Sequence, residues 1–109
     1  MLIVAADVLG HRLRDRNGTV VGRVTAFYNY PTEMRAQPGA VAVTCGRVNR
    51  STRLVDLIDA VLDGPDVVAA YPLALIHSAP LSEHGAGDTL SDQHALAVLA
   101  HYWINLGPA

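Results

Sequence analysis

The chain has 109 residues, half of them apolar and 17% charged, which is typical of a globular domain and not of a disordered segment. That length is enough for one modest core, so we expect a single domain over residues 1–109. No apolar run reaches the ~18 residues needed to cross a bilayer, so no membrane insertion is expected. The single cysteine excludes an internal disulfide and, with no basic leader at the start, favours a cytoplasmic location.

Charge is distributed unevenly along the chain. All eight basic residues are arginines at or before Arg53, against three acids there, which gives that half a net charge of +5. From Leu54 onward, seven acids and no lysine or arginine give −7. Either the acidic half folds over the basic half and cancels its field, or a basic face attracts an anionic or acidic partner.

The first structured stretch is predicted to be a β-hairpin. A short strand at Arg12–Arg14 leads to a reversal at Asp15–Gly18, and a longer strand begins at Thr19. The dipeptide Asn17-Gly18 favours a two-residue type I′ turn, because both central positions of that turn need positive φ.

This turn also sets the strand register. It places Arg14 opposite Val21, and Arg12 opposite Arg23. Two arginines directly opposite each other repel. We therefore expect acids from the C-terminal half across them, a bound anion, or a bulge or barrel corner at Gly22.

The middle of the chain alternates β-branched segments with loops that carry glycine and proline. These loops are expected at residues 29–39 and 46–52. A turn at Asp63–Asp66 precedes the last strand. The predicted elements are strands at 40–45, 53–57 and 67–71, a short helical turn at 72–78 and a linker at about 81–89. A barrel formed from these strands would occupy about residues 7–80.

The last element is predicted to be a helix over about residues 90–106. Ser91 or Thr89 can cap its start, and Gly107-Pro108 ends it. Its apolar side chains form two adjacent stripes at helical spacing. One stripe is Ala95, Val98, Leu99 and Tyr102, and its neighbour is Leu96, Leu99, Trp103 and Leu106.

So broad an apolar face must be buried, either on the sheet or against another subunit. We expect the second stripe, with apolar residues of the 72–78 turn, to form a self-association or partner surface. The alternative is that the same residues close the core. This set is Leu73, Ile76, Leu96, Leu99, Trp103 and Leu106.

Residues that often carry catalysis are present, but without catalytic spacing. His94 and His101 share a helix face but are separated by roughly 10 Å of rise, too far for one zinc ion. Cys45, at a strand end, is expected to be a small buried residue. Asp56 and Asp59 are expected to be solvated acids at a strand exit. We therefore expect no enzyme activity, no cofactor and no metal.

Several short motifs occur in an order typical of one family. They are a Leu-Gly step, an Asp-x-x-Gly hairpin, a Val-Gly-x-Val strand, an aliphatic segment, a Gly-x-x-Val-x-x-x-Tyr strand, an Ala-Pro dipeptide and a helix running from Leu-Ser to His-Tyr. Here they are Leu9-Gly10, Asp15–Gly18, Val21–Val24, Arg53–Ala60, Gly64–Tyr71, Ala79-Pro80, Leu90-Ser91 and His101-Tyr102. In this order they resemble PRC-barrel domains, notably small stand-alone actinobacterial members. Asp56 stands where the family usually has proline.

The resemblance implies a mainly β fold, a small SH3-like barrel of five to six antiparallel strands with a C-terminal α-helix. It implies a non-catalytic docking or adaptor module, which we expect to bind a protein partner and to form a homodimer. The alternative is a ribosome- or RNA-associated factor related to the barrel domain of the ribosome maturation factor RimM. Its phosphate contacts would come from Arg12, Arg14, Arg23, Arg47 and Arg50. A third option, a small-ligand site at the barrel mouth, has no residue that argues for it.

Overall fold

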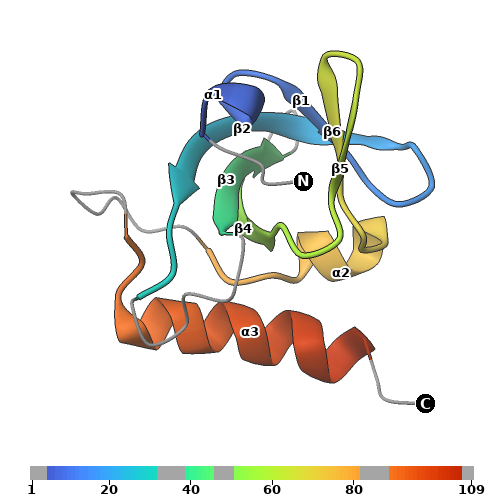
Figure 1. Cartoon of the computed structure of the whole chain (residues 1–109). Coiled ribbons are helices and arrows are strands. Elements are labelled where there is room, and N and C mark those ends of the chain that lie inside the picture. Colours follow the sequence, from blue (N-terminus) through green and yellow to red (C-terminus); the bar gives the residue numbers. More distant parts are fainter. Residues whose placement is uncertain (1–4, 32–38, 46–50, 82–88, 107–109) are drawn as a thin grey trace.

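The computed structural model describes residues 5–31, 39–45, 51–81 and 89–106. Within these ranges a strongly coiled β-sheet is covered on one side by helix α3, which makes the fold mainly β, as predicted (Figure 1). In chain order the elements are α1 (Ala5–Val8), β1 (Arg12–Arg14), β2 (Val20–Tyr28), β3 (Ala40–Cys45), β4 (Ser51–Asp56), β5 (Val61–Asp63), β6 (Asp66–Val68), α2 (Leu73–His77) and α3 (Asp92–Leu106).

The six strands form one sheet in the order β4-β3-β2-β1-β6-β5. Every neighbouring pair is antiparallel except β1 and β6, which run parallel, so the prediction of a wholly antiparallel sheet is wrong. The β5–β6 hairpin joins the free edge of β1, where Val67 lies beside buried Leu13. Leu13 and Val67 are both fully buried, so the parallel pairing extends the core from β1 to β6.

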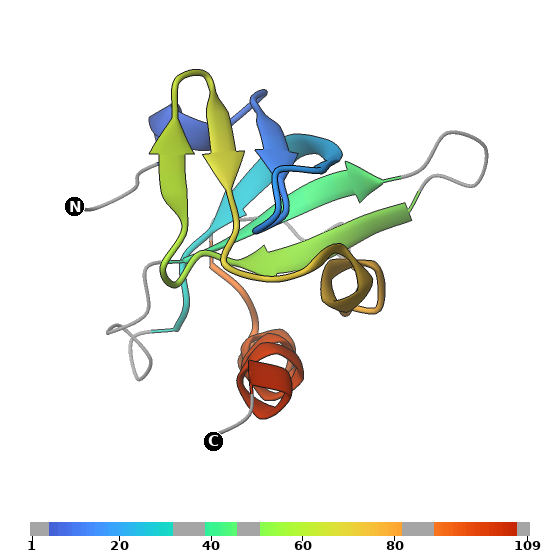
Figure 2. The ribbon, with the colours of Figure 1, turned by 90° about the vertical axis from the view of Figure 1, so that its right-hand side faces the viewer.

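The sheet curls until its two halves cross at a large angle, but in the described residues no ladder joins β4 to β5 (Figure 2). The outer edge of β4 is instead covered by the segment after α2. The backbone N–H of Leu54 donates to the Pro80 carbonyl at 3.0 Å, and Arg53 forms an isolated bridge with Leu81. The result is a coiled, open sheet.

The reversal between β1 and β2 is wider than the predicted type I′ turn. Gly18 has φ +92°, but Asn17 does not have positive φ, so the two-residue prediction is wrong. The cause is Asp15, whose carboxylate accepts the backbone N–H groups of Asn17 and Thr19 at 2.9 and 2.8 Å. With Asp15 buried in this role, the loop contains three residues and ends at the glycine.

Gly22 lies where β2 passes close to the backbone of β3. A Cβ built on Gly22 would stand 1.9 Å from the backbone oxygen of Thr44, so any side chain there collides with the next strand. The register shifts fall at Val21 and Thr25, on either side of this glycine. Gly22 therefore allows β2 and β3 to lie close together in the part of the sheet that bends.

Helix α3 begins at Asp92 and is capped by Ser91, one of the two residues predicted for that role, whose hydroxyl accepts the backbone N–H of His94 at 3.2 Å. Its first predicted stripe faces the sheet, with Ala95, Val98 and Tyr102 fully buried. The hydroxyl of Tyr102 donates to the Leu54 carbonyl at 2.6 Å and ties the helix to β4. Burial and this hydrogen bond together fix the rotation of α3 on the sheet.

A buried carboxylate connects the parts of the fold that meet at the end of β4. Asp56 is fully buried and accepts hydrogen bonds from the hydroxyls of Tyr30 at 2.6 Å and Tyr71 at 2.8 Å, and from the Ile58 N–H at 3.2 Å. The expectation that Asp56 is a solvated acid is therefore wrong. Burial raises the pKa of Asp56, and these hydrogen bonds oppose the rise. Asp59, three residues on, is exposed as expected.

The Tyr30→Phe substitution tests this buried cluster, since it removes one hydroxyl donor to Asp56. We expect the free energy of unfolding to fall by about 1.5–3 kcal/mol at neutral pH, because the lost bond reaches a buried charged group. In acid, where the carboxyl is neutral, the loss should shrink to about 1 kcal/mol. Urea unfolding followed by circular dichroism at both pH values measures the difference.

The direction of this pH effect follows from linkage. A folded-state pKa above the unfolded one gives stability that is complete in acid and is lost as the pH rises through the raised value. Removal of a hydroxyl that stabilises the anion raises the pKa of Asp56 further, so the gap to the wild type widens with pH. Tyr28→Phe is the control, because the half-buried Tyr28 hydroxyl has no hydrogen-bond partner among the described residues. Equal effects of the two substitutions on the free energy of unfolding would contradict the role of the Tyr30 hydroxyl as a donor to Asp56.

Gly22→Ala tests the close approach of β2 and β3. We expect a loss of about 3 kcal/mol in the free energy of unfolding, because the backbone of Thr44 cannot move away without breaking its ladder. Gly64→Ala is the matched control, since Gly64 has φ +58° but open space around it, and it should cost only about 1 kcal/mol. Thermal unfolding of both variants provides the measurement, and a smaller loss for Gly22→Ala would refute the steric argument.

Candidate functional site

The residues predicted to form one apolar surface are divided between the core and the exterior. Ile76 is fully buried and belongs to the core, so its assignment to an interface is wrong. Leu73 and Leu99 are half-buried against that core. The side chain of Leu106 lies outside the described part of the structure.

Leu96 and Trp103 remain on the exterior, 57% and 45% exposed. They are two helical turns apart on the side of α3 that faces away from the sheet, and Ala97 and Ala100 between them are also exposed. We call these four residues the outward face of α3. From Gln93 to Leu106 the helix carries no lysine, arginine or carboxylate, so nothing charged interrupts this face. A solvent-exposed helix face is usually polar, so this one is a candidate contact surface.

The predicted basic residues divide similarly. Arg12, Arg14 and Arg23 lie on the neighbouring strands β1 and β2, whereas Arg47 and Arg50 lie outside the described residues. Arg12 pairs with Arg23 across the ladder, as the sequence predicted. The three-residue loop places Arg14 opposite Val20 instead of Val21, so that part of the predicted register is wrong. The bulge at Val21 then shifts the register back by one residue, which brings Arg12 opposite Arg23.

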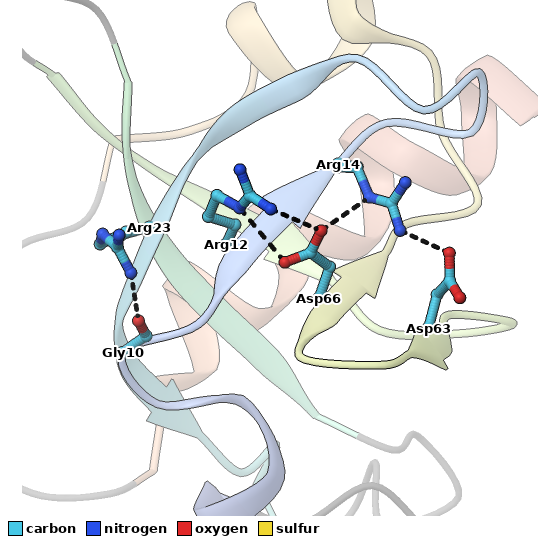
Figure 3. A network of polar contacts seen from close by, with 6 residues as sticks. All are labelled: Gly10, Arg12, Arg14, Arg23, Asp63 and Asp66. Atoms are coloured by element: carbon cyan, nitrogen blue, oxygen red, sulfur yellow. Dashed lines mark hydrogen bonds and ion pairs between the residues drawn. The ribbon is translucent and has the colours of Figure 1, made fainter.

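Acids of the β5–β6 hairpin neutralise two of these arginines. Asp66 lies between Arg12 and Arg14, and Asp63 lies beyond Arg14 (Figure 3). Arg12 donates from Nε and Nη2 to the two carboxylate oxygens of Asp66, both at 3.2 Å. The acidic half of the chain therefore does fold over part of the basic half. Sequence reasoning missed Asp66 as the partner, because the parallel pairing of β1 with β6 brings together residues that are far apart in the chain.

Arg23 differs from its two neighbours. Its guanidinium forms no ion pair with a carboxylate of the described residues, and its Nη1 donates to the Gly10 carbonyl at 2.8 Å. Its side chain is exposed. The basic character left on this side of the sheet is therefore concentrated at Arg23.

The one cysteine is buried, as predicted. Cys45 is 4% exposed, and its thiol donates weakly to the Val43 carbonyl at 3.5 Å. Burial raises the pKa of this thiol, an effect that nearby Arg53 partly opposes. A thiol with a raised pKa in a buried strand lacks the thiolate character of a nucleophile.

Comparisons of the chain with protein-family models, with curated proteins and with solved structures find no match. The resemblance to PRC-barrel domains therefore remains a prediction that depends on the motifs. Among the described residues no group of three or more His, Cys, Asp and Glu side chains is placed to hold a metal ion. No helix in the described ranges is long and apolar enough to span a membrane.

Asp66→Asn tests the pairing of the two halves of the chain. The substitution leaves Arg12 and Arg14 without their shared carboxylate, whose side chain is only 9% exposed. We expect the free energy of unfolding to fall by about 1–2 kcal/mol, a figure reduced by the exposure of Arg12. Urea denaturation at low and high salt measures this loss. The difference in the free energy of unfolding between variant and wild type should become smaller at high salt, because ions screen the charges.

Asp63→Asn is the matched control for this prediction. The side chain of Asp63 is 68% exposed, and Arg14 is the one ion-pair partner of its carboxylate among the described residues, so its loss should cost about 0.5 kcal/mol or less. If both substitutions had the same effect, Asp66 would not be the acid that holds β6 against β1.

Proposed function

We propose that this chain is a non-catalytic interaction module of the PRC-barrel type that self-associates through the outward face of α3. The observation that carries the proposal is the exposure of Leu96 and Trp103 on a helix whose other side is already buried. The ordered motifs and the coiled sheet support the barrel family. The cytoplasmic location predicted from the sequence is part of the same proposal.

The expected occupant of this surface is a second copy of the chain. With no charge between Gln93 and Leu106, two such helices can pack without like-charge repulsion. The 15-residue helix is about 22 Å long, which allows a two-fold contact along its length. In an antiparallel arrangement Leu96 of one copy meets Trp103 of the other, and the reverse contact follows by symmetry. Exposed tryptophan is the residue type most enriched at the centres of such contacts.

The ion pairs weaken the alternative of an RNA-associated factor. Arg12 and Arg14 would have to exchange Asp63 and Asp66 for phosphate, and the nearby carboxylates would repel a polyanion. Of the three described arginines suggested for that role, only Arg23 has no carboxylate partner within the described ranges. The interaction-module proposal is therefore preferred.

Trp103→Ala tests the proposed function directly. We expect the wild type to be a dimer and this variant to dissociate with a Kd at least about 10-fold higher, since truncation of a central tryptophan typically removes more than about 1.4 kcal/mol of binding free energy. Leu96→Ala should act in the same direction with a smaller effect. Sedimentation equilibrium over a range of protein concentrations measures each Kd.

Val61→Ala is the matched control, because Val61 is 56% exposed on β5, away from α3, and its loss should leave the Kd unchanged. Circular dichroism confirms that each variant is folded. A wild-type protein that is monomeric at high concentration, or a folded Trp103→Ala variant with unchanged Kd, would overturn self-association through α3.

A further inference from the structure

A small hollow lies between β1, β2 and the turn that joins β5 to β6. It has a volume of about 190 Å³ and is lined by Gly10, His11, Arg12, Arg23, Pro65 and Asp66. In Figure 1 this end of the sheet lies across the molecule from α3, so contacts made by the outward face of α3 leave it open.

Part of the lining, here called the floor, is Gly10, which has no side chain. Gly10 has φ +79°, and a Cβ built on it would meet nothing within 4 Å, so open space begins directly above this residue. Gly10 is held in place by its N–H, which donates to the Val24 carbonyl at 2.9 Å, and by its carbonyl, which accepts from Arg23. The position of the Arg23 guanidinium is therefore tied to the same backbone that forms the floor.

Arginine side chains supply spare hydrogen-bond donors to this space. A guanidinium carries five N–H donors, and the structure accounts for one of those on Arg23, the Nη1 bond to Gly10. Arg12 uses Nε and Nη2 on Asp66, which leaves Nη1 free of any described acceptor (Figure 3). The side chain of Arg12 is 51% exposed and the Arg23 side chain is exposed as well, so both are accessible from solvent.

The charge of the lining selects the kind of anion. Apart from His11, the charged residues of the lining are Arg12 and Arg23, with two positive charges, and Asp66, with one negative charge, which leaves a single positive charge for a ligand to balance. A carboxylate carries one negative charge and matches the planar fork of a guanidinium. A phosphate dianion would exceed this balance, and its second negative charge would increase the repulsion from Asp66 that any anion in the hollow meets.

The size of the hollow selects the source of that carboxylate. Pockets that enclose small-molecule ligands usually have volumes of about 300–1,000 Å³, well above the volume found here. A single acidic side chain that projects from another protein needs much less space. We propose that this hollow is a recognition site for one glutamate or aspartate side chain of a protein partner, held by Arg23 and Arg12.

The test uses the full chain labelled with ¹⁵N and a short, terminally blocked peptide with one glutamate among glycines. We expect the Nε–Hε signals of Arg23 and Arg12 and the amide of Gly10 to shift and saturate as the peptide is added. The same peptide with glutamine in place of glutamate should cause no saturable shift. Arg16, an exposed arginine in the β1–β2 loop outside the hollow, is the internal control and should not move.

Variants and other anions complete the experiment. Arg23→Gln should weaken binding of the glutamate peptide about 10-fold or more, because a charge-assisted hydrogen bond is lost. Arg16→Gln should leave the affinity for this peptide unchanged. Both substitutions change exposed side chains, and an amide spectrum that is unchanged away from the substituted residue and its contacts verifies that each variant is folded. Equal shifts at Arg16 and Arg23, or an unchanged affinity of the Arg23→Gln variant, would overturn the site.

Acetate, inorganic phosphate and a single-stranded RNA oligonucleotide are the competing probes. Binding of the peptide in preference to all three supports a protein side chain as the ligand. If acetate binds as tightly as the peptide, the proposal that the carboxylate comes from a protein partner is wrong, and the ligand is a small free carboxylate. Tighter binding of phosphate or RNA would overturn the charge argument.

Discussion

The buried carboxylate of Asp56 is the interaction on which the rest of this structure depends. It lies at the end of β4 and accepts the hydroxyls of Tyr30, from the segment after β2, and Tyr71, from the segment after β6. A buried carboxylate without such donors would be strongly destabilising. The three residues therefore have to meet, and the segments that carry them can cross the end of the sheet in few ways.

This cluster also positions the helix. The ring of Tyr71 packs against that of Tyr102 with centroids 4.3 Å apart, and Tyr102 donates to the Leu54 carbonyl. Once Tyr102 is inside, helical periodicity places Trp103 and Leu96 on the other side. The candidate contact surface on α3 is thus a consequence of the burial of Tyr102 on the opposite side of the helix. The hollow beside Arg23 lies at the opposite end and depends instead on the pairing of β1 with β6.

The sequence predicted those features whose causes are local. The cap at Ser91 and the two apolar stripes of α3 follow from spacing within one helix. The predicted pairing of Arg12 with Arg23 is also correct, but only because the three-residue loop and the bulge at Val21 shift the register by one residue each and cancel. The turn at Asp15 was missed because its geometry depends on a side chain that accepts backbone N–H groups, which competes with the preference of the Asn-Gly dipeptide.

Long-range features could not be predicted in the same way. In the sequence, Asp56 resembles an ordinary solvent-exposed acid at the end of a strand. The hydroxyls that make its burial favourable come from tyrosines 26 and 15 residues away. The parallel contact of β1 with β6 likewise depends on the coil of the whole sheet. The exposure of Leu96 and Trp103 could be given only as one of two alternatives, because a stripe at helical spacing does not say which side meets the core.

The most direct test of the role of Asp56 is a ¹³C NMR titration of its side-chain carboxyl carbon in the full chain. Burial raises the pKa of Asp56, so the account predicts a titration midpoint above the ordinary carboxyl range, together with chemical-shift changes in the Tyr30 and Tyr71 rings over the same pH interval. A midpoint at the ordinary value, with no response in either tyrosine, would show that Asp56 is solvated and would contradict the account.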